Sequence, residues 1–368
     1  MSDPIPAPIW QDALSLCRDL QSGSISAQAV MSNVYDRINA LNPTLNALVD
    51  LLPQDQALAL AVEADAVPIA ARGPLHGLPM APKDAVAVKG FATTWGFPGF
   101  ADNIEPSDDE LARRMRAAGA IFIGHSNMPE FGLGSHTFNE LYGNTYNPYD
   151  LSKTPGGSSG GAAVALAADL LPLADGSDLG GSLRNPASFC NVVGFRPSIG
   201  RMPFNRGFGW FGRMVTTGPM AKNIPDTVLM FSIIAGPDRS DPLTLSDPGI
   251  TFLDALTPLD DKELKDLRVG FSTDLGSLAI DPEVAQTVRD AASSMESLGA
   301  HVVEAAPNLD GAMNVFQVQR AAGLRLLAKR LETISPDWRS MIKDTARWNI
   351  DKGLALTADE LMQSELQR

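Results

Sequence analysis

Apolar positions recur at helical spacing near the beginning of the chain. After Ser26 they fall three or four residues apart, which predicts a helix that ends at Asn42-Pro43. A second helix is predicted near residues 54–65. Residues 107–110, Ser-Asp-Asp-Glu, have the form of a capping box and predict a third helix, which Gly119 ends. The apolar positions of the first helix are Val30, Met31, Val34, Tyr35, Ile38 and Leu41.

Short apolar runs between turns predict strands. Residues 120–124 and 170–175 have the composition of buried strands, and the segment GPLHGLPMAPKDAVAVKG, residues 73–90, is typical of a strand with a turn at each end. Residues 267–272, a helix from Asp281 with proline in its first turn, and residues 301–306 form the pattern of a βαβ-like unit.

The alternation of strands and helices indicates an α/β fold. We expect a large mixed, mainly parallel central sheet that helices cover on both faces. From about Asp310 the pattern is helical again, and no interdomain linker is visible. The prediction is a single domain over residues 1–368, with a helical N-terminal region at about 1–66, a core at about 67–260 and a βαβ-like and helical region at about 261–368.

Composition and charge narrow the functional classes. The chain has 29 basic and 43 acidic residues, so its net charge is 29 − 43 = −14. A surface this acidic repels phosphate backbones and anionic lipid, which argues against direct binding of nucleic acid or a membrane surface. No signal peptide or membrane-spanning run is visible. Two distant cysteines make no disulfide framework, so we expect a cytoplasmic protein.

The densest chemical signal is the glycine- and serine-rich segment at residues 154–189. Its first glycine cluster, GGSSGG at 156–161, allows three interpretations. A phosphate-binding P-loop is weakly supported, because alanine rather than Lys-Ser/Thr follows the last glycine. A nucleophile elbow centred on Ser159 needs a preceding strand and a later histidine in a suitable place, and the sequence offers neither clearly. A flexible linker is the third interpretation, and the apolar segments on both sides argue against it.

Ser182 follows a second pair of glycines, in SDLGGSLR. Glycines can turn successive N–H groups toward one point, as an oxyanion hole requires. A serine at the end of such a run could be a nucleophile. From the spelling alone, a helix-capping serine would be the commoner case.

These residues resemble the amidase signature family of serine hydrolases. The match runs without a break from Gly156 through GGSSGG, the helix of small residues and Asp178 to Pro186-Ala187. GLPMAPKDAVAVKG resembles the family's lysine segment, and GHSNMPEFGLGSHTFNELYGNTYNPYD resembles the stretch before the signature. Further similarity continues through GFRPSIGRMP and TTGPMAKNIPDTVLMFSIIAG, so that it covers residues 10–310 approximately.

The resemblance implies a Ser-Ser-Lys triad. Ser182 matches the nucleophile, Lys83 the general base, and Ser158 the bridging serine, which follows a cis peptide bond in the family. The backbone of Leu179, Gly180, Gly181 and Ser182 matches the oxyanion hole. Asp178 and Arg184 match a structural ion pair near the site, and segment 131–136 is a candidate wall of the substrate pocket.

Lysine can act as a base only when it is neutral, and its unperturbed pKa is about 10.4. Burial among apolar groups disfavours the ammonium form, and the setting of Lys83 in LPMAPKDAVAV fits this need. Asp84 would oppose the effect if the two side chains met, but neighbours on a strand point to opposite faces. By position alone, Lys83 would be a surface or ion-paired lysine, and we leave Lys89 with that interpretation.

The resemblance thus implies an amidase that cleaves a small-molecule amide through an acyl-enzyme, without cofactor or metal. The four histidines are not spaced as metal ligands. A homodimer is compatible with the sequence. The alternatives are a glutaminase-type A subunit of a tRNA-dependent amidotransferase, and a truncated, inactive member of the fold. Family members usually continue beyond the position of Arg368, so the resemblance implies that a C-terminal part is missing.

Overall fold

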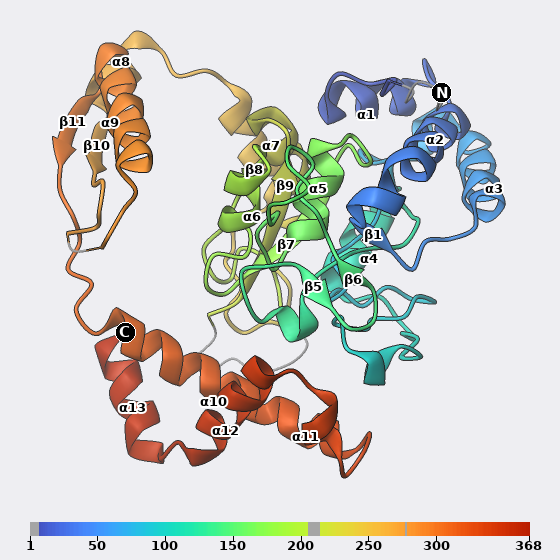
Figure 1. The fold of residues 1–368 in the computed structure, drawn as a ribbon. Coiled ribbons are helices and arrows are strands. Elements are labelled where there is room, and N and C mark those ends of the chain that lie inside the picture. The colour runs from blue at the N-terminus through green and yellow to red at the C-terminus, as the bar shows by residue number, and fades with distance from the viewer. Residues whose placement is uncertain (1–6, 205–213, 277) are drawn as a thin grey trace. The chain divides into compact units, whose positions relative to one another are not determined.

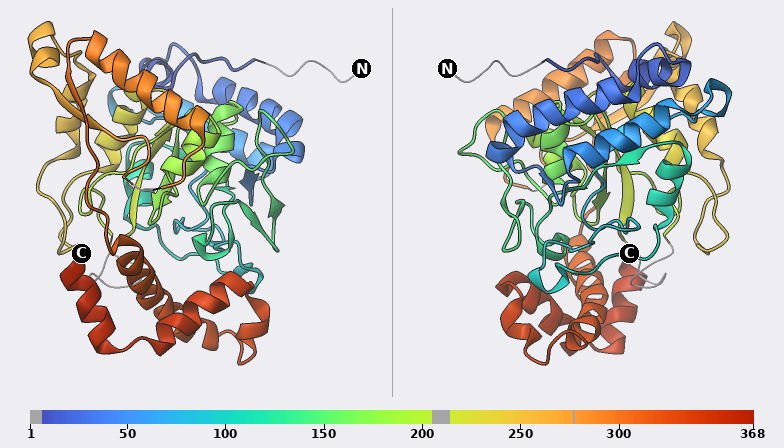
Figure 2. Two further views of the ribbon diagram at one scale, coloured as in Figure 1. Left: turned by 60° about the vertical axis from the view of Figure 1, so that its left-hand side comes forward. Right: turned by 90° about the vertical axis from the view of Figure 1, so that its right-hand side faces the viewer.

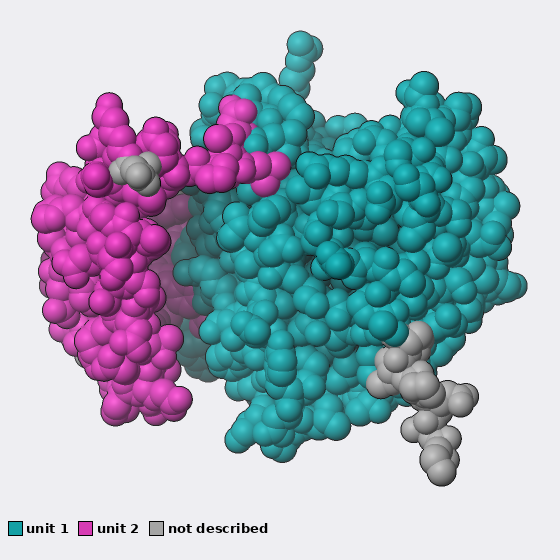
Figure 3. All heavy atoms as spheres, turned by 90° about the horizontal axis from the view of Figure 1, so that it is seen from above, with its two compact units in different colours: residues 1–253, 321–355 teal, residues 254–320, 356–368 magenta. Residues whose placement is uncertain are grey.

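The computed structural model describes residues 7–204, 214–276 and 278–368 and shows an α/β protein (Figure 1). The chain divides into two compact units (Figure 3). The first unit consists of residues 1–253 and 321–355, and the second of residues 254–320 and 356–368.

Three helices begin the first unit: α1 (Ala13–Ser22), α2 (Ala27–Leu45) and α3 (Gln54–Asp65). Helices α2 and α3 lie side by side (Figures 1 and 2). The Ser26 side chain accepts a hydrogen bond from the Ala29 N–H, so the predicted start of α2 is confirmed. The predicted end at Asn42-Pro43 is wrong. The helix continues to Leu45, because a proline in the last turn removes only one hydrogen bond while Leu45 still packs in the core.

The third predicted helix is α4 (Glu110–Ala117), and Gly119 follows its end with a φ of +99°. The predicted capping box is wrong in register. Asp109 caps the helix by accepting from the Ala112 N–H at 3.0 Å, while Glu110 pairs with Arg113 and Arg114. Since aspartate caps as well as serine does, the sequence alone could not choose between the two positions.

The strands of the first unit are short. The strands β1 (Leu48–Val49) and β4 (His125–Ser126) are antiparallel, as are β5 (Phe138–Asn139) and β6 (Gly143–Asn144). The strands β2 (Pro79–Met80) and β3 (Ile121–Phe122) are parallel. The largest sheet of the described residues has three antiparallel strands in the order β7 (Ala174–Asp178), β9 (Thr216–Ala221) and β8 (Val193–Gly194).

The predicted large, mainly parallel sheet is therefore not confirmed. The described strands form several small sheets, and the longest ladder is antiparallel. The apolar run at 170–175 marks the approach to β7 rather than the strand itself, which begins at Ala174 and is rich in polar residues. Burial of the apolar run explains the error, because hydrophobicity alone does not distinguish a buried strand from a buried turn.

The core of the first unit packs around α5 (Gly160–Ala167), which directly follows the GGSS sequence. The helix is made of small residues and is buried on nearly all sides, as expected for a central helix without a polar face. Helices α6 (Arg184–Phe189) and α7 (Ile224–Ile234) complete this part of the unit. Short 3-10 turns lie at Ile69–Ala71, Pro98–Phe100, Glu130–Gly132 and Gly249–Leu256.

A second apolar cluster joins residues 321–355 to the same unit. It contains side chains from the end of α10 (Ala312–Glu332), from α11 (Trp338–Met341) and from α12 (Asp344–Ala355). These pack against the aromatic rings of Phe97, Phe100 and Phe131. The ring centroids of Phe97 and Phe131 are 5.1 Å apart.

The second unit contains the predicted βαβ-like element. The strands β10 (Arg268–Phe271) and β11 (His301–Glu304) are parallel, and α9 (Pro282–Ser297) connects them. Asp281 caps α9, so this prediction is confirmed. The unit also includes α8 (Asp261–Asp266) and α13 (Ala358–Gln367). Among the described residues, no helix combines the length and hydrophobicity needed to cross a membrane.

We predict that Gly161→Ala destabilises the protein by about 3 kcal/mol or more. A Cβ atom at Gly161 would lie 2.3 Å from the Asn127 amide nitrogen and 2.5 Å from the Ala47 carbonyl oxygen, so backbone would have to move. Gly323→Ala, in α10, is the matched control, because no atom lies within 4 Å of its added Cβ. Its stability should rise by up to about 1 kcal/mol. Chemical denaturation measures both changes, and equal effects would contradict the packing argument.

Candidate active site

The backbone of Lys83 is fixed by strands on two sides. Lys83 forms a parallel bridge with Ser126, just beyond the pairing of β2 with β3. Its N–H donates to the Asp175 carboxylate on β7, with distances of 3.3 and 3.4 Å to the two oxygens. The residue is 1% exposed, so its side chain lies wholly inside the protein.

The Lys83 amine lies among serine hydroxyls. Its Nζ is 2.7 Å from Ser158 Oγ, 2.9 Å from Ser159 Oγ and 3.0 Å from Ser177 Oγ. The Ser159 hydroxyl donates to the Ser177 carbonyl at 3.5 Å, so toward Lys83 it can act only as an acceptor. A neutral amine has two N–H donors and one lone pair, which leaves the lone pair for one of the other two hydroxyls.

Ser158 and Ser159 lie at the beginning of α5. The peptide bond between Gly157 and Ser158 is cis, the geometry expected from the resemblance. Both serines are buried. The positive end of the α5 dipole therefore lies near the lysine amine, where it disfavours a further positive charge.

Burial lowers the pKa of Lys83 from its ordinary value of 10.5 to about 7, against the opposing charges of Asp175 and Asp178. Desolvation is the largest cause, because a buried ammonium loses its hydration. Asp84 does not lie on the same side. Its carboxylate accepts from the Thr94 and Gly96 N–H groups. A substantial fraction of Lys83 is consequently neutral at physiological pH.

Asp178 organises the turn that contains Ser182. Its buried carboxylate accepts from the N–H groups of Gly181 and Leu183 at 2.8 and 3.2 Å. Two 3.0 Å hydrogen bonds join it to Arg184, and Arg196 lies 3.3 Å away. Burial alone would raise the pKa of Asp178, but these donors outweigh it and hold the pKa below its usual value. Asp178 is thus ionised and shapes the turn.

Ser182 lies next to the lysine cluster through its backbone. Its carbonyl accepts from the Ser159 N–H at 3.3 Å, and the residue is half-buried. The helix-capping interpretation does not hold, since Leu183 is the N-cap residue of α6 and no side chain caps that helix.

The backbone N–H groups expected to form an oxyanion hole are not equivalent. That of Gly181 donates to Asp178, so it is engaged within the protein. Within the described part of the chain, no hydrogen bond occupies the N–H of Leu179, Gly180 or Ser182. Leu179, Gly181 and Ser182 are half-buried, and Gly180 is exposed.

Segment 131–136 lies against Ser158. A methyl group added to Gly132 would be 3.5 Å from Ser158 Oγ and 3.5 Å from the Met128 methyl carbon. The adjacent Phe131 belongs to the second apolar cluster. This arrangement is consistent with a wall next to the serine cluster. Lys89, in contrast, is exposed and away from the cluster.

Two polar groups on β7 were not predicted from the sequence. Asp175 and Ser177 are two residues apart, so they point to the same face of the strand, and both contact Lys83. The signal was present in the alternation of ADGSD. The predicted strand ends at residue 175, however, so the sequence did not indicate that Asp175 and Ser177 share one face of a strand.

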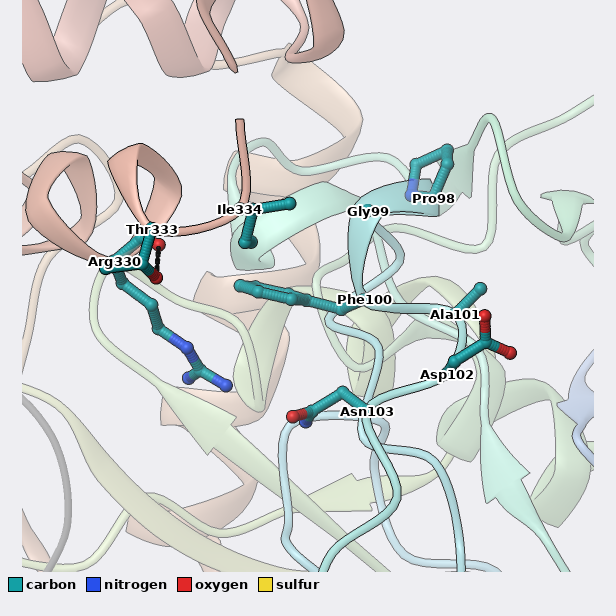
Figure 4. Close-up of a pocket in the computed structure, with 9 residues that line it drawn as sticks. All are labelled: Pro98, Gly99, Phe100, Ala101, Asp102, Asn103, Arg330, Thr333 and Ile334. Atoms are coloured by element: carbon teal, nitrogen blue, oxygen red, sulfur yellow. Dashed lines mark hydrogen bonds between the residues drawn. The ribbon is translucent and has the colours of Figure 1, made fainter. Parts of the chain in front are cut away.

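A surface hollow of about 360 Å³ lies elsewhere in the first unit (Figure 4). Phe100 and Arg330 line it, and the Arg330 guanidinium stacks 4.4 Å from the centre of the Phe100 ring. None of the predicted site residues borders this hollow. Among the described residues, no group of three or more histidine, cysteine or acidic side chains could hold a metal ion.

The fold and the cluster together define an α/β protein with a buried serine–lysine site. The chain belongs to the Amidase family, whose model matches residues 29–361. The family resemblance seen in the sequence is therefore confirmed.

Known relatives agree with this assignment. An acylamidase from Rhodococcus erythropolis is 39% identical over 300 residues, which are 81% of this chain and 62% of that protein. The A subunit of a glutamyl-tRNA(Gln) amidotransferase from Dechloromonas aromatica (strain RCB) is 37% identical over 287 residues, 77% of this chain and 58% of that protein. The chain thus spans about three fifths of the length of these relatives. A bacterial aryl acylamidase structure matches with a TM-score of 0.84 and 28% identity, and the match covers 98% of this chain and 76% of that one.

We predict that Lys83→Met gains stability relative to the wild type as the pH falls from about 10 to about 7, by up to about 1.4 kcal/mol per pH unit. In this pH range Lys83 is protonated in the unfolded state but largely neutral in the folded state, where its pKa is about 7. The free energy of unfolding of the wild type therefore decreases as the pH falls, whereas that of Lys83→Met does not. Urea unfolding at several pH values measures the trend. Lys89→Met, which removes an exposed lysine, is the control, and a pH-independent difference for Lys83→Met would contradict the prediction.

Proposed function

We propose that the protein hydrolyses carboxylic amides through an acyl-enzyme on Ser182, with Ser158 as proton relay and Lys83 as base. The observation that carries the proposal is the 2.7 Å contact between Lys83 Nζ and Ser158 Oγ in a buried setting that lowers the pKa of the lysine to about 7. A base with a pKa near the working pH is the most effective proton acceptor. Family membership supports the same chemistry.

The proposed reaction begins with attack of Ser182 Oγ on the amide carbonyl carbon. The Ser182 proton passes to Ser158 Oγ, while the Ser158 proton passes to the lone pair of Lys83 Nζ. Collapse of the tetrahedral intermediate breaks the C–N bond, and the proton returns through Ser158 to the leaving nitrogen. Water then attacks the acyl-enzyme by the same proton path and releases the carboxylic acid.

Backbone amides would stabilise the tetrahedral oxyanion. The sequence resemblance implied Leu179, Gly180, Gly181 and the Ser182 amide. Because the Gly181 N–H donates to Asp178, we assign the donor role to Leu179, Gly180 and Ser182, and we assign Gly181 the role of shaping the turn. The Asp178 ion pairs with Arg184 and Arg196 hold this turn and do not take part in proton transfer.

The amide substrate is a small molecule in this proposal. The acylamidase relative supports hydrolysis of an acyl amide, and the amidotransferase relative supports glutamine as a second candidate. We favour the acyl amide, because a Cβ atom at Gly132 would meet both Ser158 Oγ and the apolar methyl carbon of Met128 at 3.5 Å, which places an apolar surface near Ser158. An apolar wall contributes binding energy to an apolar acyl group and little to a polar one.

A fluorophosphonate probe should label the wild type, and Ser182→Ala should abolish the labelling. Lys83→Ala should slow it at least about a thousandfold, because the nucleophile loses its base. Labelling is measured by intact-protein mass spectrometry. Ser188→Ala, which removes an exposed serine of α6, is the matched control and should label like the wild type. Labelling that survives Ser182→Ala would refute the nucleophile assignment, and a folded wild type that never labels would indicate the inactive alternative.

Acyl amides should be better substrates than glutamine. We expect kcat/KM for an apolar N-acyl amide or anilide to exceed that for glutamine at least about a hundredfold, since glutamine places charged groups in the site. Release of amine and of ammonia measures the two reactions, with Ser182→Ala as the blank. Efficient ammonia release from glutamine would instead favour the amidotransferase-type alternative.

A further inference from the structure

A buried carboxyl group lies beside the backbone of the lysine. Asp175 and Ser177 occupy the same face of β7. Ser177 Oγ contacts the Lys83 amine at 3.0 Å, while the Asp175 carboxylate contacts the backbone N–H of the same lysine at 3.3 Å. Asp175 is 1% exposed, so its field reaches the amine through protein rather than through water.

The two acids near Lys83 differ in how their charges are balanced. Asp178 is paired with Arg184 and Arg196. Within the described residues, Asp175 forms no ion pair with an arginine or lysine side chain. The negative charge of Asp178 is therefore largely balanced by its own partners. The charge of Asp175 is left to act on the lysine.

The other charged groups around the lysine face elsewhere. Asp84 accepts from Thr94 and Gly96, and the Nδ1 atom of His125 lies 2.9 Å from the Pro82 carbonyl. Asp109 caps α4 and acts on Asp175, where its charge opposes ionisation. The serines at the start of α5 are uncharged. Among these charged groups, Asp175 is thus the acid whose charge acts most directly on the protonation of Lys83.

We propose that Asp175 is a positioning residue for the base, whose ionised carboxylate stabilises the Lys83 ammonium formed during proton transfer and sets the pH at which the lysine becomes a base. The inference rests on the proposed function of Lys83. No covalent step is added: Lys83 receives the proton as before, and Asp175 acts on it through the charge of its carboxylate form. Asp175 thus plays the part for a lysine base that the aspartate of a Ser-His-Asp triad plays for histidine.

The direction in which Asp175 shifts the pKa of Lys83 follows from their charges. The charge of Asp175 raises the pKa of Lys83, while burial lowers it. Burial also raises the pKa of Asp175 to about 7, with Asp109 acting in the same direction and Lys83 in the opposite one. Each charge acts on the pKa of the other group, so the two groups titrate as a pair. Removal of the carboxylate charge should therefore lower the pH at which Lys83 loses its proton.

Asp175→Asn tests the proposal, because the asparagine oxygen can still accept from the Lys83 N–H. The titration of Lys83 is followed by NMR of protein labelled with ¹³C and ¹⁵N in lysine, with Lys83→Met to assign the signal. We expect its midpoint to fall by about one pH unit or more. The acid limb of kcat/KM should move by the same amount, and the plateau of kcat should fall about tenfold as the ammonium loses its counter-charge.

Two further variants serve as controls. Asp175→Glu keeps the charge and should leave the midpoint near that of the wild type. Asp84→Asn removes a buried carboxylate next to Lys83 in sequence that faces away from it. This control should lower stability but leave the midpoint unchanged. If Asp175→Asn does not fold, Asp175→Leu replaces it, since leucine is uncharged and of similar size, although it leaves the Lys83 N–H without its acceptor.

The outcomes separate the two proposals. If the titration midpoint of Lys83 is unchanged or raised in folded Asp175→Asn or Asp175→Leu, the role of Asp175 is overturned, whether or not the protein hydrolyses amides. A lowered midpoint in a protein without Ser182-dependent hydrolysis supports the electrostatic pair and refutes the proposed function. An equal shift in Asp84→Asn also overturns the proposal, because the effect would then reflect loss of any nearby buried charge.

Discussion

The structure depends on the burial of one amine. In the proposed reaction, Lys83 can serve as a base only because the protein removes water from its amine and surrounds the amine with serine hydroxyls rather than with a directly paired carboxylate. Three elements converge to make this possible: the end of β2, the beginning of α5 and the polar face of β7. Each is short, and none could exclude water alone. The apolar core around α5 supplies the exclusion.

Close approach of backbones is the second requirement. A Cβ atom at Gly176 would lie 2.7 Å from both Ser159 Oγ and the Leu183 side chain, so only glycine lets α5 and the turn that contains Ser182 meet β7. Asp178, two residues further on, then fixes that turn through two backbone amides and two arginines. The same strand thus contacts the Lys83 amine, through Ser177, and holds the turn that contains Ser182, through Asp178.

The sequence allowed several helices and the residues of the serine–lysine cluster to be predicted, but not the sheet. Capping and periodicity located α2, and capping located the start of α9, because these signals are local. The strands are only a few residues long, and β7 carries polar groups that its apolar approach conceals. Asp175 and Ser177 were missed for the same reason, since two residues share a face only if they lie within one strand. Lys83 and Ser158 were found through family resemblance, and their contact of 2.7 Å depends on long-range packing that no local pattern encodes.

The wall beside Ser158 illustrates how far such packing extends. Lys343 precedes α12, and its N–H donates to the Glu130 carboxylate at 3.0 Å while its ammonium donates to the Leu133 carbonyl at 2.7 Å. Burial lowers the pKa of Lys343 and raises that of Glu130, with each charge opposing the effect on the other. The turn containing Gly132 is therefore held between these two contacts. Residues 321–355 belong to the same unit as Lys83, Ser158 and Ser182. The helices within residues 321–355 are consequently part of the support of the segment beside Ser158, even though no motif marks them.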